Sequence, residues 1–152
     1  MHRSDLGEAD RLLTVLARDR GKLRVNAKGA RKTASRKGGH IELFTRSNML
    51  IAKGRGDIDI VSQVEMTNAY RGLHEDLTRS TYAHYAVELV DAFAEEGTEQ
   101  PDIFDLLANA LGWIASSSNL PLTARYFELQ LLTHAGFQPQ LFFCAANGER
   151  LI

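Results

Sequence analysis

Alternating apolar and polar positions dominate the first half of the chain and predict antiparallel β-structure. In residues 22–28, Leu23, Val25 and Ala27 share one face, while basic and amide side chains share the other. This period of two is typical of a half-buried strand. Further strands are predicted at residues 12–17, 41–52 and 58–64, the last with Ile58, Ile60, Ser62 and Val64 on one face.

From about residue 73 the apolar period changes to 3.6, which predicts helices. The first helix is expected to end near Gly97, the second to open with Pro101 and to end before the break at residues 116–119, and the third to run from Pro121 to a left-handed cap at Gly136. The first has two apolar stripes, one of Tyr82, Tyr85, Ala86, Leu89 and Phe93 and one of Ala83, Val87 and Val90. Strands followed by helices predict an α+β fold with two segregated lobes.

Charge divides the chain in a similar way. Residues 1–55 hold 14 Lys and Arg against five Asp and Glu, whereas residues 56–152 hold four against 14. This asymmetry indicates a half that binds a polyanion, joined to a half with another task. A chance dipole between two lobes is the alternative.

The cations of the first half follow one strand and the loop after it. Lys22, Arg24 and Lys28 lie on the polar face of the strand, and the glycine-flanked loop 29–39 adds Arg31, Lys32, Arg36 and Lys37. Such a series could contact several phosphates at once, with a strong dependence on salt. A solvated surface is the alternative. Phe44 is the only aromatic residue among the first 55 and is expected in the core, which predicts little base stacking and weak sequence preference.

Enzymatic chemistry is not expected. Asp57 and Asp59, with Glu42, could form a metal site, but the alternation with isoleucine favours a solvated strand face. Glu8 and Asp10 fit a polar turn better than an acid–base pair, and the histidines are scattered. One cysteine, Cys144, excludes an internal disulfide. No membrane span or secretory signal is visible, so a cytoplasmic location is expected.

Three ordered segments carry more specific information. They are residues 5–13 (DLGEADRLL), 21–45 (GKLRVNAKGARKTASRKGGHIELFT) and 125–144 (RYFELQLLTHAGFQPQLFFC). In this order and at similar spacing they resemble the RecO family of DNA repair proteins over nearly the whole chain. The resemblance implies an OB-fold-like β-barrel at residues 1–66 and a helical domain at residues 67–152.

The resemblance also implies a function without covalent chemistry. Family members anneal complementary strands, bind single- and double-stranded DNA, form a complex with RecR, and load recombinase onto DNA coated by single-stranded DNA-binding protein. A bacterial, nucleoid-associated location follows. Residues 22–37 are similar to the DNA-contacting region of the family, with Arg11, Arg46 and Lys53 as weaker candidates.

The helical lobe of relatives also receives the acidic, apolar-ended tail of single-stranded DNA-binding protein. An apolar cleft with a cationic rim would suit such a tail. After position 55 only Arg71, Arg79, Arg125 and Arg150 supply cations. Arg125 is the first choice; its alternative role is an intrahelical pair with Glu128.

Two departures from the family pattern change the expectations. Only residues 1–4 precede the DLGE segment, so the first strand is expected to be incomplete, with an unpaired edge, as in a fragment, a chain with a mis-called start or the product of a truncated gene. Relatives often carry a four-cysteine zinc element here, but Cys144 is followed by Asn147 where a CxxC would need cysteine. No zinc or other cofactor is therefore expected. A protein-interaction adaptor and an RNA-binding OB module are the alternative functions.

Overall fold

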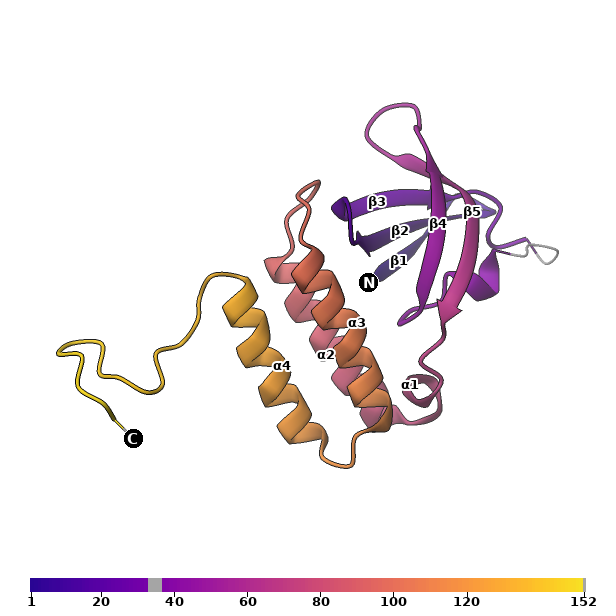
Figure 1. The fold of residues 1–152 in the computed structure, drawn as a ribbon. Helices are drawn as coiled ribbons and strands as arrows, with labels where there is room; N and C mark the ends of the chain where they lie inside the picture. The colour runs from indigo at the N-terminus through magenta and orange to yellow at the C-terminus, as the bar shows by residue number, and fades with distance from the viewer. Residues whose placement is uncertain (33–36, 152) are drawn as a thin grey trace.

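A five-stranded sheet is followed by four helices in the computed structural model, which describes residues 1–32 and 37–151 (Figure 1). The predicted α+β class and the order of the two parts are confirmed. The strands are β1 (His2–Leu6), β2 (Asp10–Ala17), β3 (Gly21–Ala27), β4 (Arg46–Ala52) and β5 (Asp59–Asn68).

The sheet has the order β1-β2-β3-β5-β4. All neighbouring strands are antiparallel except β3 and β5, which pair in parallel through Val25 opposite Asp59 and Asn26 opposite Ile60. β1, β2 and β3 form an antiparallel meander, and the parallel pairing of β3 with β5 joins it to the β4–β5 hairpin. This is the open, OB-like barrel that the resemblance implied. Its interior is small, with Leu13, Val25, Ala27, Ala30, Ile41 and Val61 as its buried residues.

β1 and β4 are the two edges of this sheet. β1 pairs with β2 over residues 2–6. Ion pairs also link the β1 side of the sheet to the segment before β4. Glu42, in that segment, pairs with Arg3 on β1 and with Arg11 on β2. The expected incomplete first strand thus corresponds to a short edge strand that is held by charge as well as by its ladder.

The predicted strand 41–52 was too long, because β4 begins only at Arg46. The preceding residues form a short 3₁₀ helix, Gly38–His40, and a turn in which Phe44 has a φ of 57°. Such a left-handed conformation is uncommon for a residue with a side chain. It turns Phe44 away from the barrel interior.

The predicted face of β5 was also wrong. Val61 is fully buried and Ser62 is exposed. The reason is a register shift in the β4–β5 ladder, where Leu50 pairs with Gln63 but Ile51 pairs with Val61. Ser62 is therefore the extra residue of a β-bulge, which places Val61 and Val64 on the same interior face although they are three residues apart.

The helices are α1 (Gly72–Glu75), α2 (Leu77–Phe93), α3 (Pro101–Ser116) and α4 (Leu120–His134). Asp76 and Asn119 cap α2 and α4, because their side-chain oxygens accept hydrogen bonds from the backbone N–H groups of Arg79 and Leu122. Gly136, with φ of 84°, follows α4 as expected. In the described residues, no helix has both the length and the apolar character for a membrane span.

Two details of the helical prediction were wrong. The four-residue α1 was not predicted, and α2 ends at Phe93 rather than near Gly97. The buried stripe of α2 is Ala83, Ala86, Val87 and Val90, whereas Tyr85 is exposed. Small residues lie inward because α3 and α4 pack closely on this side of α2.

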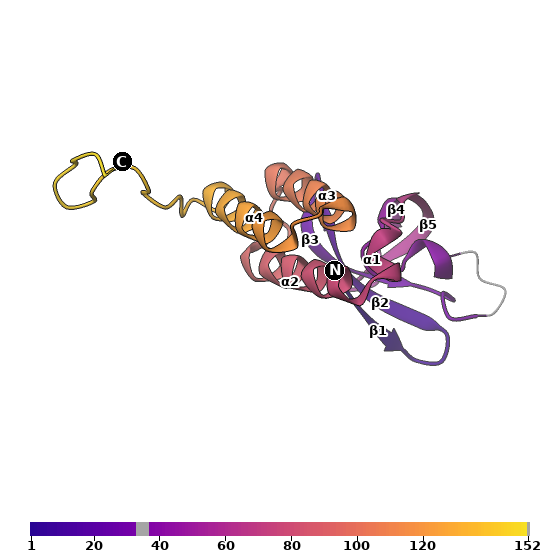
Figure 2. The ribbon, with the colours of Figure 1, turned by 90° about the horizontal axis from the view of Figure 1, so that it is seen from below.

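Phe44 joins the two parts of the molecule. Its ring is 6% exposed and belongs to the core of the helices, where it packs edge-to-face on His84 at 4.6 Å between ring centroids. Leu16 of β2 and Leu43 contact the same core. Helices and barrel therefore lie side by side (Figures 1 and 2), while the segment after α4 extends away on the side opposite the barrel (Figure 2).

Replacing Phe44 by alanine should destabilise the whole molecule by about 3–5 kcal/mol, because the cavity lies in the core that both parts share. Urea unfolding measures the change. The matched control is Phe142→Ala, since Phe142 is 60% exposed, and its effect should stay within about 0.5 kcal/mol. Equal effects of the two substitutions would contradict a shared core.

Candidate nucleic-acid interface

The predicted basic strand face exists on β3. Val25 and Ala27 point inward and are buried, while Arg24 on β3 and Lys28 directly after it are exposed. Lys22 is on the same outer side but is more covered, with 17% of its side chain exposed. β3 thus presents cations outward because the barrel interior takes the alternate positions.

A turn held by Asp10 follows β3. The Asp10 carboxylate accepts hydrogen bonds from the backbone N–H of Gly29, at 2.8 Å, and from Asn26 Nδ2, at 3.3 Å. These hydrogen bonds, the one from Gly29 most and the one from Asn26 next, lower the pKa of Asp10 below its ordinary value. The nearby charges of Lys28 and Lys32 lower it further. Asp10 therefore holds the turn at the start of the loop that follows β3.

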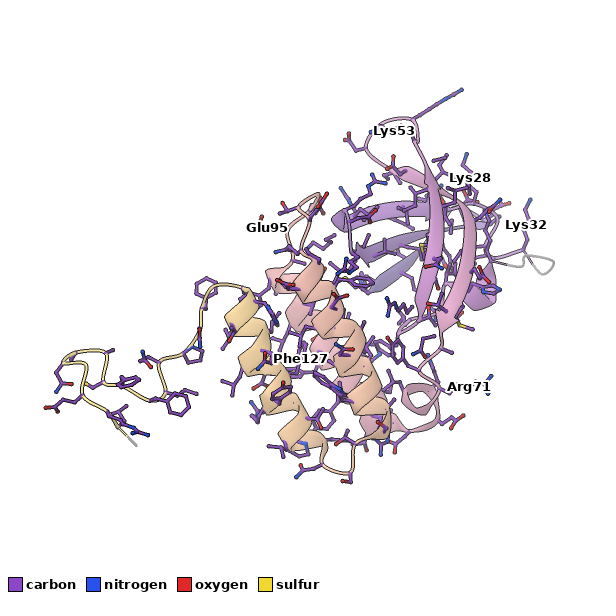
Figure 3. The ribbon with its side chains drawn as sticks, in the orientation of Figure 1. Lys28, Lys32, Lys53, Arg71, Glu95 and Phe127 are labelled. Carbon is purple, nitrogen blue, oxygen red and sulfur yellow. The ribbon has the colours of Figure 1, made fainter. Side chains whose placement is uncertain are left out.

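Four exposed cations border this part of the barrel. Lys28 and Lys32 follow β3, and Lys53 and Arg55 lie on the β4–β5 loop. In the part of the chain that the structure describes, none of the four has a carboxylate within 4 Å. Figure 3 shows Lys32 and Lys53 projecting outward from the two loops, with Lys28 on the barrel between them. We call Lys28, Lys32, Lys53 and Arg55 the open cations. Arg55 was not among the predicted DNA contacts.

Other predicted DNA contacts take part in internal interactions. Arg31 bonds the Gly7 carbonyl and lies 3.5 Å from Asp5, Lys37 donates to the Val61 carbonyl at 2.9 Å, and Arg11 pairs with Asp5 and Glu42. The guanidinium of Arg46 stacks over the Phe104 ring at 5.4 Å. Arg36 lies outside the described residues. A role of these residues in binding DNA stays a prediction.

Lys22 and Arg24 face carboxylates of the helical part. Lys22 Nζ lies 3.4 Å from Asp91, and Arg24 Nε lies 4.0 Å from Glu96. Sequence reasoning missed these partners because they are about 70 positions away. The signal that could have indicated them was the density of acids at the end of α2 and directly after it.

The three carboxylates that could suggest a metal site do not meet. Asp59 pairs with Arg20 at 2.9 Å, Glu42 pairs with Arg3 and Arg11, and no group of three potential metal ligands occurs in the described part of the chain. The pKa of Asp59 is lowered, first by the Arg20 guanidinium and then by the Gly54 N–H. Asp59 therefore acts as an ion-pair partner.

The family's zinc element does not fit the residues present. Cys144 lies in a small hairpin in which Phe143 bridges Arg150, and the backbone N–H groups of Asn147 and Ala146 lower the pKa of its thiol. Asn147 supplies an amide where a second thiolate would be needed. One thiolate does not make a closed tetrahedral zinc site.

A second candidate site is a groove on the helices. Its volume is about 500 Å³, and its lining is mainly apolar: Trp113, Ser116, Ser117, Leu122, Thr123 and Tyr126. Trp113 and Tyr126 meet at 5.4 Å between centroids. Arg125, next to Tyr126, is 70% exposed and pairs with Glu128 at 2.5 Å, which is the intrahelical role expected as its alternative.

Comparison with known proteins matches the two parts separately. Residues 1–70 match the recombination protein O N-terminal family model, and residues 74–152 match the C-terminal model. The chain is 45% identical over 151 residues to DNA repair protein RecO of Roseiflexus sp. (strain RS-1), which covers 99% of this chain and 53% of that protein. It is 44% identical over 148 residues to the RecO of Desulforudis audaxviator (strain MP104C), covering 97% and 58%. The chain thus spans little more than half the length of these curated relatives.

Stability should fall in acid, because Asp10, Asp59 and Asp105 all have lowered pKa values in the folded state. Their stabilising effect is complete above the ordinary value of 3.8 and is lost as the pH falls through the folded values, where the unfolded chain binds more protons. Urea midpoints between pH 6 and pH 3 should therefore decline below about pH 4. Asp59→Asn should make this decline shallower.

The control for this titration is Glu65→Gln. Glu65 is exposed and makes no ion pair in the described part of the chain. A decline in the Asp59→Asn protein as steep as in the control would show that the Arg20–Asp59 pair has no part in the acid sensitivity.

Proposed function

Because this chain belongs to the RecO family, we propose that it is a DNA-binding mediator of recombination in DNA repair. One observation carries the DNA-binding part: four open cations border two loops of an OB-like barrel and have no carboxylate partner in the described residues. OB-folds bind nucleic acid through the face of β2 and β3 and the adjoining loops, including the β4–β5 loop.

The open cations fit a phosphate backbone better than they fit bases. They are long, exposed and separated along the barrel surface, and the only aromatic residue of residues 1–55, Phe44, is buried in the shared core. Electrostatic contacts without stacking give strong salt dependence and little sequence preference. Binding of both single and double strands follows from this chemistry.

The further steps of mediation rest on the family and on the relatives' name. They are annealing of complementary strands, complex formation with RecR, and loading of recombinase on DNA coated by single-stranded DNA-binding protein. None needs a covalent intermediate or a cofactor. The chain spans 53% and 58% of the two relatives described above, so these activities are proposed for the chain as part of the family's machinery in the bacterial nucleoid.

The test of DNA binding is fluorescence anisotropy of a labelled single strand of about 30 nucleotides across a salt series. If four phosphates are contacted, log K against log salt should have a slope of about −3. Lys28→Ala/Lys32→Ala and Lys53→Ala/Arg55→Ala should each weaken binding about tenfold at low salt and flatten the slope by about 1.4.

The matched control removes two cations elsewhere. Arg71 and Arg125 are exposed on the helical part, so Arg71→Ala/Arg125→Ala changes the net charge equally. If the control loses as much affinity as the other two variants, the site is not on the barrel. If the folded wild type does not bind at low salt, the DNA-binding assignment is wrong, and the protein-interaction adaptor becomes the function to test. Preference for RNA over DNA of one length would indicate the RNA-binding module.

We also propose that the groove beside Arg125 receives the acidic, apolar-ended tail of single-stranded DNA-binding protein. The groove exposes the side chains of Tyr126 and Leu122, and Arg125, the residue before Tyr126 on the same helix, has an exposed guanidinium that pairs with Glu128. The apolar end of the tail would occupy the groove. A carboxylate of the tail would replace Glu128 as the ion-pair partner of Arg125.

A peptide with the sequence of this tail should bind with micromolar affinity, and Arg125→Ala and Leu122→Ala should each weaken it about fivefold or more, as measured by anisotropy. Arg71→Ala is the control, because it removes an exposed cation just before α1, whereas Arg125 lies on α4, which lines the groove. Equal losses for Arg71→Ala and Arg125→Ala would place the tail elsewhere. DNA binding should be unchanged in all three proteins.

A further inference from the structure

A segment rich in acids lies against the basic hairpin of the barrel. Residues 91–105 contain six acids and no Lys or Arg, and we call them the acidic segment. The hairpin is the turn between β2 and β3 with its flanking residues, Arg18, Lys22 and Arg24 among them. Figure 3 shows Glu95 of the acidic segment beside the start of β3.

Each of these three hairpin cations has a carboxylate partner in the acidic segment. Arg18 binds Asp105 with both Nε and Nη2, at 3.1 and 3.0 Å. Lys22 Nζ lies 3.4 Å from Asp91 Oδ1 and donates to the Asp91 carbonyl at 2.8 Å, and Arg24 Nε lies 4.0 Å from Glu96. The pairing is one to one. The mutual hydrogen bonds lower the pKa of Asp105 and raise that of Arg18.

The backbones of the two segments are also in contact. Lys22 N–H donates to the Glu95 carbonyl at 3.4 Å, and the Gly97 N–H donates to the Lys22 carbonyl at 3.0 Å. A Cβ on Gly21 would lie 1.9 Å from the Thr98 carbonyl oxygen, so only glycine permits this approach. The contact is therefore a specific fit of two surfaces and not merely an attraction between opposite charges.

Two of the three side-chain pairs at this contact are well exposed and can exchange partners, whereas the Lys22 side chain is 17% exposed and also donates to the Asp91 carbonyl. The partners Arg18 and Asp105 are 60% and 45% exposed, and Arg24 and Glu96 are 51% and 64% exposed. Exposed ion pairs are individually weak, and a phosphate oxygen offers the same cation an equivalent partner. The apolar core around Phe44 joins the two parts independently of these pairs, so the cations can change partner while the parts stay together.

We propose that the acidic segment is an intramolecular competitor of DNA for the cations of the β2–β3 hairpin. Without DNA, its carboxylates hold Arg18, Lys22 and Arg24. When a strand bound by the open cations extends along β3, its phosphates replace the carboxylates one by one. The inference rests on the proposed function and adds a regulation to it. While the acidic segment holds the hairpin cations, the affinity for short or weakly held strands is lower. Only longer strands displace the carboxylates and gain these cations as additional contacts.

The test neutralises the three paired acids. Asp91→Asn/Glu96→Gln/Asp105→Asn should raise the affinity for a 30-nucleotide strand about tenfold at low salt. It should also steepen the salt slope by about 2, because three more cations become available to phosphates. The matched control is Glu65→Gln/Glu75→Gln/Glu88→Gln, which neutralises three exposed acids that have no ion pair in the described residues. A gain in the control equal to that of the test variant would overturn the competition.

A double-mutant cycle separates competition from a general change in charge. Lys22→Ala/Arg24→Ala should reduce the affinity of the wild type less than twofold on a strand of about 10 nucleotides, because both cations are occupied. In the variant without the three acids, the same pair of substitutions should cost about fivefold or more. Equal losses in the two backgrounds would overturn the proposal.

Failure of the proposed function gives a different result. If neither the wild type nor the acid-neutralised protein binds DNA while thermal unfolding shows both to be folded, DNA binding and its regulation are both wrong. If the wild type binds with the expected salt slope and the acid-neutralised protein behaves like its control, only the regulation is wrong.

Discussion

Burial of Phe44 in the core of the helices is the contact on which the arrangement of the molecule depends. Among the described residues the barrel has six buried apolar residues of its own, and a sheet of this size gains limited stability from its interior. The helices supply a second apolar surface through Phe44, Leu16 and Leu43. The left-handed backbone at Phe44 is a local cost that this burial offsets.

This attachment decides where the charges of the barrel can act. With the helices on one side, the end of the β2–β3 hairpin faces the acidic segment, and the other end of β3 and the β4–β5 loop face solvent. The chain therefore does not present one uniform basic surface. It has one group of cations that faces solvent and a second group that is paired with carboxylates of the acidic segment. The sequence pattern alone does not distinguish the two groups.

Local patterns predicted the elements well, and long-range contacts explain the errors. The alternation in residues 22–28 and the 3.6 period after residue 73 depend on neighbours along the chain, so β3 and the long helices were predicted to within a few residues. The bulge at Ser62 depends on the register with β4, and the conformation of Phe44 depends on a core formed by residues between Tyr70 and Leu131. For the candidate site, residue type identified the cations, but the partners of Lys22 and Arg24 were set by the packing of the two parts.

Gly21 serves two features of the structure at once, the hairpin turn between β2 and β3 and the close contact of this hairpin with the helical part. Its φ of 65° serves the hairpin turn, and its missing side chain admits the Thr98 carbonyl. Any side chain at this position would strain the turn and separate the hairpin from the helices in the same step. A substitution of Gly21 therefore cannot loosen the contact with the helices without also straining the hairpin turn, whereas a substitution of the acids or cations around it can.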